Sequence, residues 1–195
     1  MINYLEIKKI LEDDKIIIYP TEALYGLGCK FDSQRAIENI YKIKGRNNNK
    51  PFLLLVGSFE MAQKIVEIDK KKKKFLEKYW PGHLTVIFNS RDKKETIAIR
   101  YPNTLFLNNL FEKINFPIVS TSVNRSGEIP SNDILEIKRL FSKDVDLIID
   151  IKPDKIGKAS TIIDFTKDIP SLIREGDISF SELLKDYKNY KEFIG

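Results

Sequence analysis

The chain reads YPTEALYGLG at residues 19–28, and the first residue of this stretch ends the apolar run Ile16–Tyr19, which follows Lys15. A continuous apolar run predicts a strand buried inside a sheet, and the two glycines beyond it predict a turn. Three cations follow at Lys44, Arg46 and Lys50. We interpret this arrangement as a site for a polyanion at a strand end, built without a Walker-type phosphate loop.

A second polar cluster has the sequence STSVNRSG at residues 120–127, at the end of another apolar run that begins at Ile118. Serine, threonine and asparagine at such a point most often only end a strand and form a turn. In α/β sheets, however, ligands bind at strand ends, where hydroxyl and amide groups can contact them. Two strand-end clusters of this kind predict one shared site.

The composition is that of a globular protein, with 42% hydrophobic residues in 195, and we expect a single domain over residues 1–195. The net charge of +5 permits contact with a nucleotide or RNA without requiring it. Cys29 is the only cysteine, which excludes an intramolecular disulfide framework. No apolar run approaches the roughly 20 residues of a membrane span, and residues 1–6 do not resemble a signal peptide. We therefore expect a cytoplasmic protein that does not enter a membrane.

Hydrophobic periodicity predicts strands alternating with helices, which is typical of an α/β sheet. Hairpin-like pairs of strands make the expected sheet mixed, not purely parallel. The expected helices are residues 3–13, 33–43, 59–66, 70–79, 105–114, 134–141 and a last helix after residue 179. The expected strands are residues 15–19, 52–56, 84–88, 96–100, 118–121, 145–150, 161–165 and 171–174.

The basic residues have two interpretations each. Lys44 and Arg46 could simply complement a helix C-terminus. As a functional group, Lys44, Arg46 and Lys50 would form a clamp for phosphate and carboxylate, with Arg46 bidentate and Lys50 a mobile point charge. Five consecutive lysines at residues 70–74 are more typical of a solvated helix face.

Two arginines stand at predicted strand ends, Arg100 before Tyr101-Pro102 and Arg174 before Glu175-Gly176. A surface arginine is the ordinary interpretation of each. An arginine beside a cleft at a strand end is, however, well placed to bind an anion. The lone histidine, His83, lies in a predicted turn, and one histidine cannot supply a histidine-rich metal site.

Seven ordered sequence blocks resemble the YrdC-like family of threonylcarbamoyl-AMP synthases, in a match that covers roughly residues 15–178. The match covers nearly the whole chain, and seven ordered blocks are much more specific than any one of them. The blocks are PTEALYGLG (20–28), KGR with KP (44–46, 50–51), WPGHLT (80–85), IRYP (99–102), STSVNRSG (120–127), ASTIID (159–164) and REG (174–176).

The resemblance implies a twisted, open, mixed α/β sheet with helices on its faces and a basic concave cleft. It implies an enzyme, a nucleotidyltransferase, that converts L-threonine, bicarbonate and ATP into threonylcarbamoyl-adenylate and pyrophosphate. Mg²⁺ is expected to accompany the ATP, with no dedicated metal site in the protein. The product would pass to separate transferase proteins that modify adenosine 37 of tRNAs reading ANN codons, and a weak direct contact with tRNA is possible.

The resemblance also assigns roles to individual residues. The catalytic cations would be Lys44, Arg46 and Lys50. The residues that bind ATP and the other substrates would be Thr21, Tyr25, Arg100, Ser120, Ser122, Asn124, Ser160 and Arg174.

The rival function from a different class is an RNA-binding protein that uses the same basic cleft for tRNA or rRNA without making an adenylate. Such a protein needs aromatic side chains near its basic residues, on which bases can stack. Tyr25 and Tyr41 are the candidates in this sequence. A carbamoyl-transfer module of the hydrogenase-maturation type is a further alternative, but those proteins carry additional domains.

Overall fold

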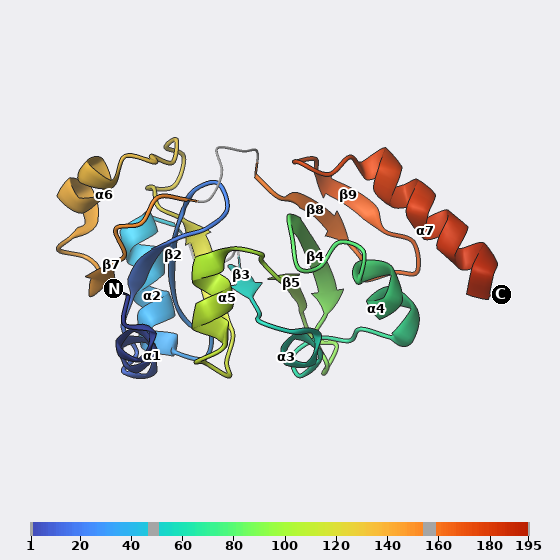
Figure 1. The fold of residues 1–195 in the computed structure, drawn as a ribbon, viewed down its shortest axis with the longest axis horizontal. Coiled ribbons are helices and arrows are strands. Elements are labelled where there is room, and N and C mark those ends of the chain that lie inside the picture. The colour runs from blue at the N-terminus through green and yellow to red at the C-terminus, as the bar shows by residue number, and fades with distance from the viewer. Residues whose placement is uncertain (1, 47–50, 154–158, 195) are drawn as a thin grey trace.

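The computed structural model describes residues 2–46, 51–153 and 159–194. Its core is a nine-stranded mixed sheet in the order β7-β1-β2-β6-β3-β5-β4-β8-β9 (Figure 1). The pairs β1/β7, β3/β5 and β4/β8 are parallel and the other neighbours are antiparallel. The strands are β1 (Ile17–Pro20), β2 (Tyr25–Lys30), β3 (Leu53–Leu55), β4 (Leu84–Asn89), β5 (Thr96–Arg100), β6 (Ile118–Ser122), β7 (Leu147–Ile148), β8 (Thr161–Asp164) and β9 (Ser171–Arg174). The predicted mixed α/β class is thereby confirmed.

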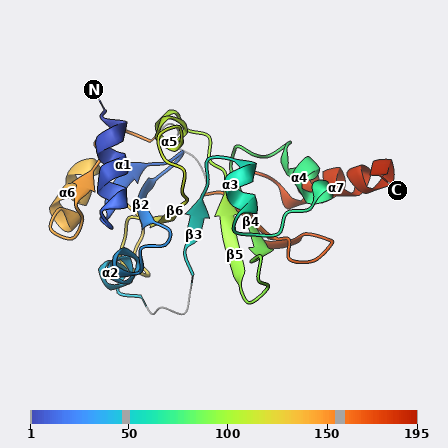
Figure 2. The ribbon, with the colours of Figure 1, turned by 90° about the horizontal axis from the view of Figure 1, so that it is seen from below.

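Helices cover both faces of this sheet. Figure 2 shows α1 and α5 on one side of β2 and β6, and α2 on the other. The buried strand β1 accounts for this arrangement, because Ile17 and Tyr19 pack with α1 and α5, whereas Ile16 and Ile18 pack with α2. The helices are α1 (Tyr4–Glu12), α2 (Gln34–Lys44), α3 (Phe59–Gln63), α4 (Lys70–Leu76), α5 (Leu105–Phe111), α6 (Ile134–Phe141) and α7 (Phe180–Ile194).

The prediction that Gly26 and Gly28 form a turn is wrong. Both lie in β2, between β1 and β6, and the turn is made by residues 21–24. A Cβ atom on Gly28 would lie 2.1 Å from the Val119 carbonyl oxygen, and a Cβ on Gly26 would lie 3.0 Å from the ring of Tyr19. Glycine is needed here because β2 must approach β6 closely and because the Tyr19 ring lies over it.

The lysine run is only in part the solvated face that the sequence predicts. Lys70 and Lys74 are exposed at the two ends of the run. Lys72, by contrast, donates a hydrogen bond of 2.8 Å to the Phe165 carbonyl oxygen and lies 5.0 Å from the centre of the Phe165 ring. Its aliphatic stem therefore packs against the sheet while its ammonium group finds a carbonyl partner, as long cationic side chains commonly do.

None of the described helices combines the length and the apolar character needed to cross a membrane.

Candidate functional site

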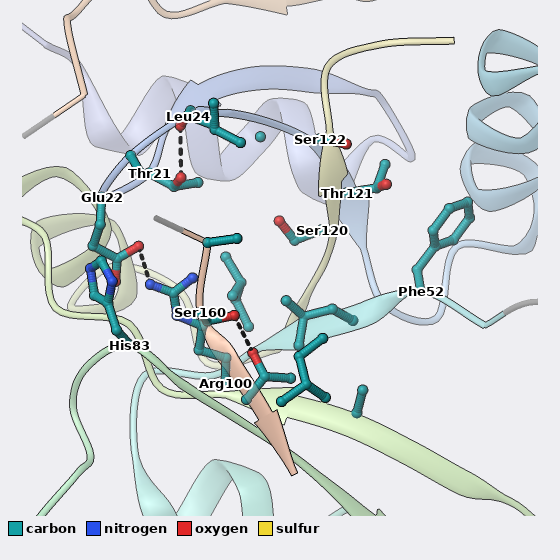
Figure 3. A pocket seen from close by; sticks show the side chains of 18 of the residues that line it. Thr21, Glu22, Leu24, Phe52, His83, Arg100, Ser120, Thr121, Ser122 and Ser160 are labelled. Carbon is teal, nitrogen blue, oxygen red and sulfur yellow. Dashed lines mark hydrogen bonds and ion pairs between the residues drawn. The ribbon is translucent and has the colours of Figure 1, made fainter. Parts of the chain in front are cut away.

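A cavity of about 360 Å³ opens on the sheet, lined by the β1–β2 turn and by residues in or next to β2, β3, β4, β5, β6, β8 and β9 (Figure 3). Eight of the eleven predicted site residues line it: Thr21, Tyr25, Arg46, Arg100, Ser120, Ser122, Ser160 and Arg174. Lys44 and Asn124 lie behind the cavity lining and bind to Ser122. Lys50 lies outside the described residues.

The β1–β2 turn forms one wall of the cavity, and hydrogen bonds from Thr21 close this turn. The Thr21 hydroxyl donates to the Leu24 carbonyl oxygen at 2.7 Å, and the Thr21 backbone N–H donates to the same oxygen at 2.9 Å. Tyr25, the first residue of β2, is only 2% exposed. Thr21 thus holds the turn in place through its bonds to Leu24, and the turn itself forms this wall of the cavity.

The end of β6 supplies a row of hydroxyl groups, as the sequence predicts. Ser120 accepts a hydrogen bond of 2.8 Å from the Tyr19 hydroxyl, which crosses the sheet from β1. The Ser122 hydroxyl donates to the Asn124 side-chain oxygen at 2.5 Å. The Asn124 amide group in turn donates to the Glu128 carbonyl oxygen at 2.7 Å, so the loop after β6 is tied back on itself.

Lys44 supports this loop from below. It is 4% exposed, and its ammonium group donates to the Ser122 carbonyl oxygen at 2.7 Å and to the Asn124 side-chain oxygen at 2.8 Å. The Ser126 backbone N–H donates in return to the Lys44 carbonyl oxygen at 2.7 Å. The end of α2 and the loop after β6 are therefore joined by hydrogen bonds through Lys44.

Burial, and secondly repulsion from the Arg46 guanidinium, lowers the pKa of Lys44 to about 8. Lys44→Met should therefore remove a pH dependence from the stability. Between about pH 8 and pH 10.5 the unfolded chain keeps a proton on Lys44 that the folded chain releases, so this residue makes folding more favourable as the pH rises.

Urea unfolding of the wild type and of Lys44→Met at pH 8 and pH 10 tests this. The difference in free energy of unfolding should move in favour of the wild type at the higher pH. Lys42→Met, at an exposed position of the same helix, is the matched control. A difference that does not change with pH would contradict the lowered pKa of Lys44.

Arg46 reaches the cavity because α2 ends in a left-handed cap. Gly45 has a φ of 59°, a conformation that suits glycine, and the Arg46 backbone N–H donates to the Tyr41 carbonyl oxygen at 3.1 Å. The chain therefore turns sharply after Lys44. The Arg46 guanidinium lies 5.2 Å from the centre of the Phe52 ring, which is a cation–π distance.

A buried ion pair closes the opposite end of the cavity. The Arg100 guanidinium lies 2.5 Å from the Glu22 carboxylate, and both side chains are almost fully buried. Glu22 also accepts from the Asn103 backbone N–H at 3.1 Å, and Arg100 donates to the Gly82 carbonyl oxygen at 3.2 Å. The sequence reasoning missed Glu22, although a carboxylate between a buried strand and an apolar strand is a signal that it needs a partner.

The ends of β8 and β9 bring in a second guanidinium beside Arg100. Arg174 donates to the Ser160 carbonyl oxygen at 2.8 Å, and the Ser160 hydroxyl lies 2.9 Å from that of Thr85 on β4. Burial, and secondly repulsion from Arg100, lowers the pKa of Arg174 below its usual value. Two neighbouring guanidinium groups repel each other, and an anion between them would relieve that repulsion.

The resulting cavity suits an extended anionic ligand. Phe52 lies toward one end of the cavity and Arg100 toward the other, with serine and threonine hydroxyls between them (Figure 3). Arg46 lies beside Phe52, and Arg174 is bonded to Ser160. Among the described residues that line the cavity, Glu22 is the only carboxylate, and Arg100 already neutralises it. Phe52 and His83, like Glu22, are lining residues to which the sequence reasoning gave no role.

Comparison with known proteins shows the family to which the chain belongs. The Sua5/YciO/YrdC family model, described as telomere recombination, matches residues 9–176. A putative threonylcarbamoyl-AMP synthase of Methanocaldococcus jannaschii is 32% identical over 94% of this chain and 94% of its own length. The threonylcarbamoyl-AMP synthase of Pyrococcus abyssi is 29% identical over 90% of this chain, which spans only 54% of that longer protein.

The fold comparison leads to the same group of proteins. The crystal structure of P. abyssi Sua5 complexed with L-threonine superposes with a TM-score of 0.85 at 28% identity. The match covers 95% of this chain and 58% of the Sua5 chain.

Proposed function

The chain belongs to the Sua5/YciO/YrdC family, and from that premise we propose that it is a threonylcarbamoyl-AMP synthase. This nucleotidyltransferase would combine L-threonine, bicarbonate and ATP to form threonylcarbamoyl-adenylate and pyrophosphate. The observation that carries the proposal is the cavity itself. It is lined by three arginines and a row of hydroxyl groups, in a fold shared with a Sua5 structure that binds L-threonine.

The proposed reaction needs electrostatic catalysis more than it needs a nucleophilic side chain. Threonine's amine and bicarbonate give a carbamate, whose oxygen attacks the α-phosphorus of ATP and displaces pyrophosphate. Negative charge accumulates around that phosphorus, so preorganised cations and N–H donors would lower the barrier. Arg46 at one end of the cavity and Arg100 with Arg174 at the other are the described guanidinium groups available for this role.

We assign Lys44 and Asn124 a supporting part in this scheme. Lys44 fixes the Ser122 carbonyl group and the Asn124 side chain, so the Ser122 hydroxyl is held where a phosphate could approach it. Ser120 and Ser160 are held in the same way by Tyr19 and Thr85. A hydroxyl whose position is fixed before the substrate binds loses less entropy when it makes its contact.

We propose that Mg²⁺ enters this site bound to the triphosphate. No group of three histidine, cysteine or acidic residues within residues 2–46, 51–153 and 159–194 could hold a metal. Magnesium commonly binds through substrate phosphates and retains several waters. When bound in this way it would neutralise part of the triphosphate charge.

The proposed product is an activated threonylcarbamoyl group, which has to be delivered to tRNA. We propose that separate transferase proteins carry out that step, on adenosine 37 of tRNAs that read ANN codons, in the cytoplasm. Direct RNA binding is less well supported by the site. Tyr25 is buried and Tyr41 packs 4.4 Å from Phe52 between ring centres, so neither candidate platform for base stacking is vacant.

The test is to incubate the pure protein with ATP, Mg²⁺, bicarbonate and labelled L-threonine. We expect pyrophosphate release that needs both threonine and bicarbonate, together with a labelled adenylate. Serine in place of threonine is the matched control for the substrate, because it lacks only the methyl group. ATP hydrolysis that is indifferent to threonine would overturn the proposed function.

A further inference from the structure

His83 lies on the cavity wall beside the buried ion pair. Its side chain is 18% exposed, and the carbonyl oxygen of the preceding residue, Gly82, accepts a hydrogen bond from Arg100. Figure 3 shows His83 at the same end of the cavity as Glu22 and Arg100, away from Phe52. The histidine is thereby fixed next to a cationic end of the cavity.

Asp177 orients the imidazole ring. Its carboxylate lies 2.6 Å from the Nδ1 atom of His83. The turn that carries Asp177 is held by one buried hydroxyl, that of Thr161, which accepts from the Gly176 and Ile178 backbone N–H groups at 2.9 and 3.1 Å. The same hydroxyl donates to the Ile178 carbonyl oxygen at 2.6 Å.

Thr161, the first residue of β8, bonds to His83 as well as to the turn that carries Asp177. The Thr161 backbone N–H donates to the His83 carbonyl oxygen at 3.1 Å. The turn also packs tightly on the chain before β8, since a Cβ atom on Gly176 would lie 2.0 Å from the Ala159 carbonyl oxygen. His83 and Asp177, far apart in the sequence, are thus held against each other by a shared support.

This geometry determines which ring nitrogen can act as a base. A carboxylate at Nδ1 keeps the proton on that atom and leaves the lone pair on Nε2. Within the part of the chain that the structure describes, no hydrogen bond to Nε2 is present. Glu22, the only carboxylate among the described lining residues, is paired with Arg100. His83 is therefore the described lining group best suited to accept a proton.

We propose that His83, oriented by Asp177, is the general base for carbamate formation, an inference that rests on the proposed function. Threonine arrives with a protonated amine, which cannot attack carbon. Nε2 takes one proton from the ammonium group, and the amine nitrogen then forms a bond to the carbon of bicarbonate. Loss of water gives the carbamate, so threonine, bicarbonate and neutral imidazole become carbamate, water and imidazolium.

The charges around His83 suit a base that must also release its proton. Asp177 stabilises the imidazolium that forms. Glu22 faces the same end of the cavity but is already neutralised by Arg100. Among the described residues the imidazolium is therefore paired with Asp177 alone, and because the His83 side chain is 18% exposed it can return its proton to water before the next turnover.

His83→Asn is the variant that tests the proposal. The asparagine amide can still donate to Asp177 in place of Nδ1, but it cannot accept a proton. We expect threonine- and bicarbonate-dependent pyrophosphate release to fall by about 10²–10⁴-fold, the usual cost of removing an acid–base group. Asp177→Asn should lower the same rate by a smaller factor. Asp32→Asn, which removes a surface ion pair with Lys30, is the matched control and should leave the rate unchanged.

The reverse reaction separates this role from a structural one. Conversion of purified threonylcarbamoyl-adenylate and pyrophosphate to ATP does not involve deprotonation of an amine, so His83→Asn should carry it out within about twofold of the wild type. The forward deficit should also shrink between pH 7 and pH 9, because more threonine then arrives with a neutral amine.

Two results would overturn the assignment of the base. One is a normal forward rate in His83→Asn, and the other is an equal loss in both directions, which would make His83 a residue for binding or folding. A wild-type protein that neither makes nor cleaves the adenylate would overturn the proposed function, and this inference with it.

Discussion

Replacing Glu22 by glutamine should lower the free energy of unfolding by roughly 3–5 kcal/mol, the cost of breaking a buried ion pair by removing one partner. The glutamine can still accept from the Asn103 backbone N–H, so the lost interaction is the charge that faces Arg100. The Arg100 side chain is only 11% exposed. Water therefore cannot fully hydrate its guanidinium group when the Glu22 charge is removed. For a domain whose total stability is typically about 5–15 kcal/mol, this is a severe loss.

Urea unfolding of Glu22→Gln, Arg100→Met and the double variant measures this effect as a double-mutant cycle. The double variant should be more stable than either single variant, because no unpaired charge then remains buried. Asp150→Asn breaks the exposed pair with Lys138 and serves as the control, with an expected cost of less than about 1 kcal/mol. A similarly small cost for Glu22→Gln would contradict the buried-pair interpretation.

The sequence predicts the fold class well because most strands contain apolar residues flanked by turn signals, and β1 and β3 are entirely apolar apart from Pro20. β2 is the exception, and its failure has a physical reason. Glycine is depleted in strands, so Gly26 and Gly28 favour a turn when they are judged locally. Their role depends on Tyr19 and Val119, which come from the strands on either side. Local propensity therefore cannot predict this need for glycine, because the need arises only when β1, β2 and β6 pair.

The site is predictable only to the level of single residues. Strand-end hydroxyls and arginines could be identified because their residue types and positions already suggest contact with an anion. Their partners could not. Nothing in the local sequence links His83 to Asp177 or Glu22 to Arg100, since each pair forms through the sheet topology. The charge of Lys44 predicts contact with an anion, yet its position under the loop after β6 depends on Ser122 and Asn124.

Lys72 shows that a run of lysines predicts exposure only in part. A row of lysines predicts a solvated face because charged groups are seldom buried alone. The structure satisfies that rule and still packs the Lys72 stem, because the ammonium group of Lys72 donates to the carbonyl oxygen of Phe165, just after the end of β8. A run of charged residues indicates that the charged groups are not buried without partners. It does not indicate how much of each aliphatic stem packs against the protein.

Arg46→Ala should lower kcat/KM for ATP by about ten- to a hundredfold, while the protein stays folded. Loss of a charged hydrogen bond costs about 1.5–3 kcal/mol, and about 1.4 kcal/mol corresponds to one factor of ten in rate. The α2 cap is retained, because it depends on Gly45 and on the backbone N–H of residue 46. The change therefore removes a side chain from the cavity without removing the turn that places it there.

The matched control is Arg139→Ala, at an exposed position of α6, which should leave kcat/KM unchanged. Arg46→Lys should recover only part of the loss if the guanidinium binds phosphate through two parallel hydrogen bonds, since an ammonium group cannot form that fork. Phe52→Leu should weaken ATP binding less than Arg46→Ala, because it removes the ring that steadies the guanidinium and keeps the charge. Near-normal kinetics in Arg46→Ala would show that Arg46 only ends helix α2, and the phosphate contact would then have to come from Arg100 and Arg174 at the other end of the cavity.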